Sequence, residues 1–254
     1  MKIKTNLTIL LLLIAFISNA QESTSEKSWK FLIEPYLMAA SMSGSAGIRE
    51  LPPIDVDFSA SDIFSNLEFG AMIYLEAQND KWAIGSDFVY MKLAQDVTPG
   101  TIINSGRLKA KQTIWEVSGL YRLLPFLEGG IGLRLNNMEM GADLNRNTIG
   151  GGSSTFVSAN NSETWVDPVI IARATKVLNE AWLFQFRGDI GGFNIGSSLT
   201  WQIQALVGYR FTKLFQTTIG YRIIDMDYDN GSGADRFRYD MSTSGPVLKL
   251  GFNI

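Results

Sequence analysis

The sequence predicts an all-β protein, a closed antiparallel transmembrane β-barrel of about ten strands connected as an up-and-down meander. Three observations carry this prediction. Apolar and polar residues alternate over long segments, short and long connections between these segments alternate, and no segment after residue 20 approaches about 18 consecutive apolar residues. A spanning strand needs about 9–11 residues, whereas a spanning helix needs about 20. The segments therefore fit strands that cross a membrane.

The first twenty residues have the three parts of a secretory signal peptide. A short basic start precedes an apolar run from Leu7 to Ile17, and small residues lead up to a predicted cleavage after Ala20. The apolar run is too short for a membrane anchor, since a spanning helix needs about 20 residues. The sequence thus predicts residues 1–20 as signal peptide and residues 21–254 as one outer-membrane β-barrel domain.

Ten segments of period two are predicted as strands. They cover residues 31–41, 67–77, 81–93, 109–122, 125–140, 163–176, 181–193, 199–211, 214–227 and 239–253. The count falls to eight if segments such as 31–41 lie outside the barrel wall. Most of the segments are long enough to cross a membrane when tilted.

The connections between these segments are sorted by length. Tight links fall at residues 78–80, 123–124, 177–180 and 212–213, and the others, except 194–198, are long: 42–66, 94–108, 141–162 and 228–238. Transmembrane barrels have this pattern because short turns face one compartment and long loops face the other. With an even strand count, both termini are expected on the tight-turn side, which is the periplasm.

Each strand is predicted to have one apolar and one polar face. In segment 199–211, Trp201, Ile203 and Tyr209 alternate with Gln202 and Arg210. Long strands with aromatic ends favour an apolar face that contacts lipid and a polar face that lines the lumen. The reverse orientation, with the apolar face as a core, would instead give a soluble periplasmic ligand-binding barrel.

Composition excludes several classes of function. The chain has no cysteine and no histidine, which excludes disulfides, zinc sites built from these residues, and catalysis that depends on histidine. Only a serine–lysine or a carboxylate-only site is left open. Removing the two lysines of the signal peptide from the total of 22 leaves 20 basic against 25 acidic residues, so nucleic acid is not expected as a partner. We therefore expect a protein that is not an enzyme and has no cofactor.

Charged residues on the predicted inner face form the main candidate site. The set comprises Glu116, Glu128, Arg134, Asp167, Arg173, Arg187, Asp189, Arg210 and Arg222, together with Glu34, Glu68, Glu76, Asp87, Arg122 and Lys249. A narrow lumen cannot hold so many charges unpaired. They either pair across the lumen and plug it, or line a narrow path for ions. Asp167, Arg173, Arg187 and Asp189 lie on neighbouring segments and are the first candidates for a paired cluster.

An acidic stretch from Asp225 to Gly231 resembles a calcium-binding loop. Its glycine stands at the seventh position instead of the sixth, and Arg236 stands where an EF-hand loop has its final glutamate. A weak divalent-cation site would use the side chains of Asp225, Asp227, Asp229 and Asp235. The simpler interpretation is an exposed acidic loop, so no metal site is predicted.

The C-terminal part of the chain carries several motifs. They are Trp165–Pro168, Arg187–Phe193, Trp201–Gln202, Gly220–Arg222, Ser244–Pro246 and a last strand with alternating apolar residues that has Phe252 as its aromatic and ends at Ile254. These motifs resemble small OmpA-like outer-membrane barrels of the type found in Bacteroidota. The resemblance implies an outer-membrane location and, as partners, outer-membrane lipids, lipopolysaccharide and the barrel-assembly machinery that reads the last strand. It implies no catalytic residue.

The expected function is that of a non-enzymatic, porin-like barrel of the cell envelope. Its lumen would be plugged by charges, and its exposed loops would bind a partner or support the envelope. The alternative is a narrow pore for ions or small solutes.

Overall fold

The protein is known from a computed structural model that describes residues 28–48, 53–97, 103–147 and 154–254. The predicted signal peptide lies outside these residues. Within them, no helix has both the length and the apolar character needed to span a membrane.

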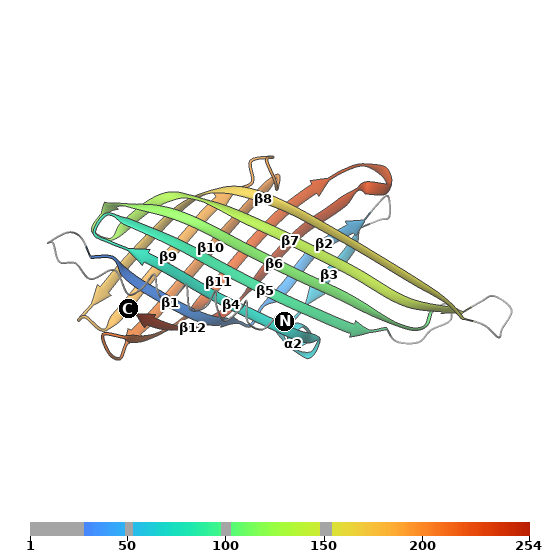
Figure 1. Ribbon diagram of the computed structural model, residues 1–254, viewed down its shortest axis with the longest axis horizontal. Coiled ribbons are helices and arrows are strands. Elements are labelled where there is room, and N and C mark those ends of the chain that lie inside the picture. The colour runs from blue at the N-terminus through green and yellow to red at the C-terminus, as the bar shows by residue number, and fades with distance from the viewer. Residues whose placement is uncertain (1–27, 49–52, 98–102, 148–153) are drawn as a thin grey trace, which may run out of the picture.

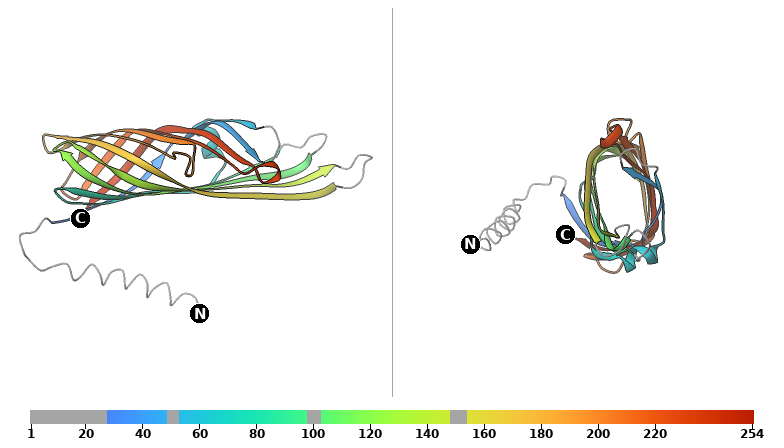
Figure 2. Two further views of the ribbon diagram at one scale, coloured as in Figure 1. Left: turned by 90° about the horizontal axis from the view of Figure 1, so that it is seen from above. Right: turned by 90° about the vertical axis from the view of Figure 1, so that its right-hand side faces the viewer.

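Ten strands form a closed antiparallel wall, which confirms the predicted fold class (Figure 1). Around the wall they are β1 (Lys30–Met38), β4 (Leu67–Gln78), β5 (Trp82–Asp96), β6 (Ile103–Leu124), β7 (Leu127–Asn147), β8 (Ser154–Leu178), β9 (Trp182–Gly191), β10 (Leu199–Arg210), β11 (Phe215–Asn230) and β12 (Phe237–Asn253). Pairing between β1 and β12 closes the ring, which Figure 2 shows from the end of the long loops. Segment 31–41 thus contributes to the wall, and the eight-stranded alternative is wrong.

The predicted long connection at residues 42–66 is largely ordered structure. It contains β2 (Ser41–Ile48), β3 (Ile54–Phe58) and α2 (Ala60–Ser65). β2 continues the course of β1 along β12, and β3 pairs with β2. The helix begins with a capping box, in which the Asp62 backbone N–H donates to Ser59 Oγ and the Ser59 N–H donates to Asp62 Oδ2.

Strands β6, β7 and β8 extend beyond the rest of the wall at the long-loop end (Figure 1). They have 22, 21 and 25 residues, so much of the predicted links at 94–108 and 141–162 is strand. Polar pairs across the strands support this extension: Lys109 Nζ donates to Asp143 Oδ2 at 2.8 Å, and Ser158 Oγ donates to Asp143 Oδ1 at 2.7 Å. The extension has polar side chains on its outward face, which is why the sequence pattern suggested loops.

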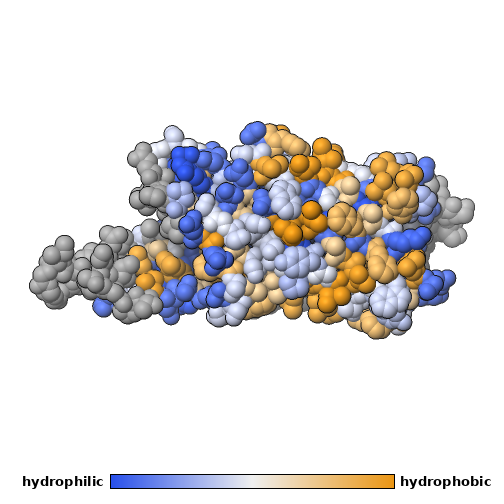
Figure 3. Space-filling view, turned by 180° about the vertical axis from the view of Figure 1, so that it is seen from behind, coloured by the Kyte–Doolittle hydropathy of each residue, from blue (hydrophilic) through white to orange (hydrophobic). Residues whose placement is uncertain are grey.

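Along the middle of the wall, apolar side chains face outward and the charged ones face the lumen. Ile131 and Phe186 are 69% and 52% exposed, whereas Arg134 is fully buried. Near the tight turns the outer face carries aromatic pairs, among them Trp82 with Tyr121 and Trp182 with Tyr209. Figure 3 shows apolar residues over much of the wall and polar ones gathered toward the long loops. This is the side-chain arrangement of a barrel whose wall contacts lipid.

The apolar band on the outside ends at Trp115 and Trp201. Beyond these tryptophans, several outward residues of the same strands and their neighbours are polar, for example Lys111, Asn137 and Asp227, and Leu199 is an exposed apolar residue among them. Tryptophan prefers the membrane–water interface. The long-loop end of the barrel therefore projects past the apolar band.

Candidate functional site in the barrel lumen

The centre of the lumen is a charged layer built around Arg134. This side chain from β7 donates from Nη2 to Glu116 Oε2 at 2.8 Å and to Asp189 Oδ1 at 2.6 Å. Arg187 from β9 pairs with the same two carboxylates, at 3.6 Å from Asp189. Because all four side chains are buried, two guanidinium groups and two carboxylates neutralise one another inside the barrel.

Further ion pairs of the charged layer connect strands on different sides of the wall. Arg222 of β11 reaches Asp87 of β5 at 2.8 Å. Arg173 of β8 pairs with Glu76 of β4 and, at 2.6 Å, with Glu128 of β7. These bridges cross the lumen, so the layer has few charges left to attract a passing ion.

Lys249 and Glu34 complete the charged layer, with Nζ 3.7 Å from the Glu34 carboxylate. The Lys249 ammonium also lies over the rings of Tyr36 and Tyr74, at 5.0 and 4.8 Å from their centroids. Cation–π contacts of this kind compensate part of the cost of burying a charge. Tyr36 in turn donates to Asp87 Oδ1 at 2.7 Å, which links this pair to the rest of the layer.

Asp167 is buried, and no arginine in the described part of the chain forms an ion pair with it. Its carboxylate accepts the backbone N–H of Ser197 at 2.6 Å, Asn136 Nδ2 at 2.8 Å and Trp165 Nε1 at 3.1 Å. Of the predicted four-residue cluster, the structure brings together only Arg187 and Asp189, while Arg173 joins a separate group. The reason is that the link between β9 and β10 folds inward, so that Ser197 lies against Asp167 where an arginine was expected.

The Asp167→Asn substitution is expected to loosen the link between β9 and β10. An amide cannot accept all the donors that now point to the carboxylate, so we expect a loss of about 1–2 kcal/mol in the free energy of unfolding. Chymotrypsin cleavage after Phe193, an exposed residue of this link, should become faster than in the unchanged protein. Asp143→Asn, at an exposed ion pair, is the control. Equal cleavage rates in both variants would contradict this role of Asp167.

Arg210 and Arg122 lie at the tight-turn mouth of the lumen. A cavity of about 450 Å³ opens there, lined by both arginines together with Glu128, Arg173 and Gln216. Arg122 donates from Nη2 to Glu128 Oε1 at 3.1 Å. The cavity thus ends against the charged layer.

Glu68 does not face the lumen, contrary to the prediction. It is an exposed residue that pairs with Lys92 and with Arg107, each at 2.7 Å. The cause is a register shift between Leu67 and Phe69 in the pairing of β4 with β5, which reverses the alternation at this point.

The acidic stretch of β11 does not assemble a metal site. Asp225 and Asp227 alternate with the inward-facing Met226 and Tyr228 and therefore project outward. Asp229 is engaged by Arg236 at 2.6 Å, and Asp235 is exposed. Among the residues that the structure describes, no group of three or more acidic side chains has the geometry to hold a metal ion.

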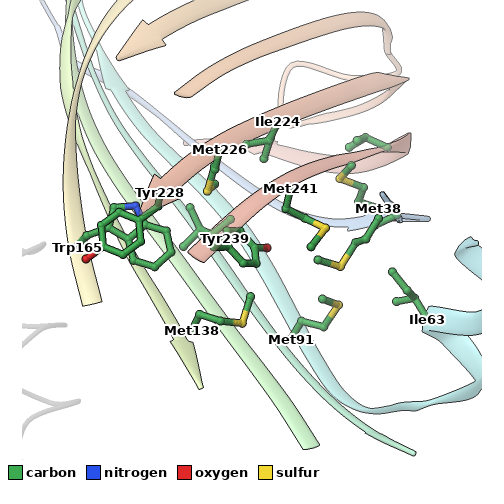
Figure 4. Close-up of a cluster of buried hydrophobic side chains, with 14 of the residues drawn as sticks. Met38, Ile63, Met91, Met138, Trp165, Ile224, Met226, Tyr228, Tyr239 and Met241 are labelled. Carbon is green, nitrogen blue, oxygen red and sulfur yellow. The ribbon is translucent and has the colours of Figure 1, made fainter. Parts of the chain in front are cut away.

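Toward the long loops, buried apolar side chains replace the charged ones in the lumen, and Figure 4 shows part of this apolar cluster. We call this region the apolar layer; its buried members are Tyr36, Met38, Ala40, Met42, Ile63, Tyr74, Met91, Ile114, Met138, Trp165, Ile224, Met226, Tyr228, Phe237, Tyr239, Met241 and Val247. Trp165 and Tyr228 stack with ring centroids 4.1 Å apart. The chain has nine methionines, and apart from Met1 all of them lie in this layer or, as Met72 and Met140 do, against it.

The apolar layer was not predicted, although the sequence contains a signal for it. Met138 and Met140 follow Arg134 on the same face of β7, and Tyr239 and Met241 precede Lys249 on the same face of β12. The inner face thus changes character along each strand. The prediction treated the whole inner face as polar and therefore did not detect this change.

Comparisons with known proteins give likeness in fold only. No family model and no curated protein sequence matches the chain. Among solved structures, the outer membrane protease OmpT from Escherichia coli has a TM-score of 0.49 at 9% identity, covering 91% of this chain and 99% of that one. Ail, the attachment invasion locus protein of Yersinia pestis, in complex with sucrose octasulfate, has a TM-score of 0.36 at 10% identity, covering 90% and 99%. Neisserial surface protein A has a TM-score of 0.27 at 12% identity, covering 91% and 99%. At these identities and scores, the likenesses say nothing of what this chain binds or does.

Proposed function

We propose that the chain is an integral protein of the bacterial outer membrane that conducts no ions and catalyses no reaction. Its barrel would be closed by the charged layer, and its projecting long-loop end would bind a partner or support the envelope. The observation that carries this proposal is the set of buried ion pairs that bridge the lumen, with Arg134 at its centre.

The membrane placement is supported by the outer face of the wall. Exposed apolar side chains form a band between the aromatic pairs at the tight turns and the tryptophans Trp115 and Trp201. In the proposed orientation the tight turns and both termini of the mature chain are periplasmic, and the long loops are extracellular. Such a barrel would contact outer-membrane lipids and lipopolysaccharide.

The assembly of the barrel is proposed to depend on the last strand. Leu248, Leu250 and Phe252 face outward from β12, and the backbone of Ile254 pairs with Phe31 of β1 at 2.8 and 3.0 Å. β12 therefore both closes the ring and presents the alternating apolar residues that the barrel-assembly machinery reads. The excess of acidic over basic residues argues against nucleic acid as a partner.

The absence of catalysis is supported by the composition and by the lumen. The whole chain has neither histidine nor cysteine. The carboxylates Glu116, Asp189 and Asp87 are engaged by arginines, so none of the three is a free general base.

A planar-bilayer recording tests the closed state. The unchanged protein is expected to show no stable conductance, because buried ion pairs bridge the lumen. Arg187→Ala removes one of the two guanidinium groups beside Glu116 and is expected to produce a measurable leak. Arg238→Ala, at the exposed rim, is the control and should stay silent. Discrete conductance steps in the unchanged protein would favour the narrow pore instead.

A further inference from the structure

We propose that the apolar layer is a binding site for an uncharged, apolar small molecule, which enters sideways from the membrane between β1 and β4. This inference rests on the proposed membrane placement. It begins from a break in the wall, continues with the helix that covers the break, and ends with the side chains behind it.

The wall is interrupted between β1 and β4. The two strands pair only from Lys30 with Gln78 up to Pro35 with Ile73. Beyond Pro35, β1 keeps its pairing with β12, while β4 keeps its pairing with β5. Proline has no backbone N–H to donate, so it is a natural place for a ladder to stop. We call the interval between the two strands beyond this point the seam.

A short strand covers part of the seam. β3 pairs with the edge of β2 that faces it, and among the residues that the structure describes β3 pairs with no further strand, so an interval is left between β3 and β4. The helix α2 then connects β3 to β4. Because a spanning wall normally satisfies its backbone groups between strands, a wall segment held by side-chain packing is a weak point.

One side chain of α2 anchors it to the barrel interior. Ile63 is only 5% exposed and belongs to the apolar layer, whereas Phe64 next to it is 51% exposed. In Figure 4, Ile63 lies beside Met38 and Met91. Besides Ile63, one backbone hydrogen bond, from Ala94 of β5 to the carbonyl of Asn66 at the end of the helix, holds this segment to the wall. Withdrawing the helix therefore costs little compared with breaking a ladder of hydrogen bonds.

The two sides of the seam are both apolar. On the outside, Leu37 and Phe69 are 67% and 58% exposed, and on the inside Met38 and Met72 belong to or pack against the apolar layer. An apolar molecule dissolved in the membrane would therefore meet apolar side chains along the whole way. The charged layer below stops it from going on toward the tight turns.

The composition of the layer indicates the class of ligand. Its buried members are aliphatic or aromatic, and the charged groups that touch them, such as Asp167 at Trp165 and Asp87 at Tyr36, lie at its boundary and already have hydrogen-bond partners. An ionised ligand would therefore lose its hydration without gaining a partner. Methionine side chains are unbranched and adaptable, and they fill irregular spaces and yield to a guest more readily than branched ones. The methionines of the described chain gather in and against this layer. Their adaptable side chains would let the layer repack around an uncharged ligand.

Quenching of tryptophan fluorescence tests the site in the full mature chain inserted into lipid vesicles. The probe is bromobenzene, an uncharged apolar quencher. Trp165 is one of six tryptophans. Its contribution to the fluorescence, called the Trp165 share below, is obtained as the difference between the unchanged protein and Trp165→Phe. We expect this share to be quenched saturably by bromobenzene and to be unaffected by the anionic 4-bromobenzoate. No quenching of the Trp165 share, or equal quenching by both probes, would overturn the proposal.

The route of entry has its own pair of variants. Ile63→Ala removes the anchor of α2 and should speed quenching of the Trp165 share about tenfold, since truncating a buried isoleucine weakens the packing that holds the helix. Phe64→Ala, on the exposed side of the same helix, should leave the rate unchanged. Equal rates for Ile63→Ala and the unchanged protein would overturn entry through the seam.

Failure of the binding site can be distinguished from failure of the proposed membrane placement. Insertion is checked first by the heat-dependent migration of the folded barrel in gels. A chain that fails to insert contradicts the membrane placement. A chain that inserts but whose Trp165 share is not quenched contradicts only the binding site.

Discussion

Arg134→Ala is expected to lower the free energy of unfolding by about 3–5 kcal/mol, the cost of leaving buried carboxylates without their partner. Arg134 is fully buried and is the common partner of Glu116 and Asp189. The two carboxylates would then face each other with only Arg187 to neutralise them. Urea unfolding of the barrel in lipid vesicles, followed by tryptophan fluorescence, measures the change.

A matched control for this variant is Arg107→Ala. Arg107 also has two acidic neighbours, Glu68 at 2.7 Å and Asp96 at 3.8 Å, but its side chain is 48% exposed. Exposed ion pairs contribute about 0–1 kcal/mol, so this variant should unfold almost like the unchanged protein. Similar losses in the two variants would show that burial of Arg134 does not carry the stability of the charged layer.

Ile131→Arg is expected to destabilise the inserted barrel by about 2–4 kcal/mol, because it places a charge against the lipid tails near the middle of the band. Ile131 is 69% exposed on the outer face of β7, between Gly129 and Leu133. In a soluble barrel the same exposed position would face water, and an arginine there would cost almost nothing. The change in the free energy of unfolding caused by Ile131→Arg therefore distinguishes a wall surrounded by lipid from a wall surrounded by water.

The control for Ile131→Arg lies on the same face of the same strand. Asn137 is three outward positions further along β7, beyond the end of the apolar band. Asn137→Arg should change the free energy of unfolding by less than about 1 kcal/mol, since lipid-face charges cost little near the interface. Refolding yield in vesicles of both variants, scored by heat-dependent gel migration, gives the comparison.

The wall could be predicted from the sequence because its signal is repeated. Each of the ten strands has period-two alternation over its full span of the membrane, as in Trp201 to Arg210, and the closure follows from the need to leave no edge in lipid. The insertion between β1 and β4 lacked that signal. β2 is rich in serine and glycine, and β3 has only five residues. Ser59 and Asp62 have the spacing of a capping box, which indicates a helix start. A helix of six residues is too short to show the 3.6-residue periodicity of apolar residues.

The candidate site could be predicted only as a set of residues and not as a set of contacts. Alternation places Glu116, Arg134 and Arg187 on one face, but it does not state which partners meet across the lumen. That depends on the stagger of the strands and on links that fold inward, as Ser197 does toward Asp167. The apolar layer was not predicted for a different reason. The charged residues in the middle of each strand were taken to represent the whole inner face, including its apolar end.

The long arms of β6, β7 and β8 have a consequence for the behaviour of the protein at high density. β8 pairs with β9 only from Val169 onward. Among the described residues β7 is thus the one strand that pairs with its earlier part, and the link between β9 and β10 contacts it only near Asp167. A bare strand margin of this kind can recruit a strand from a neighbouring molecule and start aggregation. Here the margin displays Ser158, Asn160 and Ser162 toward water. These polar side chains give a neighbouring strand little apolar area to cover. Among the described side chains of residues 156–162, the exposed Phe156 is the one that could support attachment of a neighbouring copy.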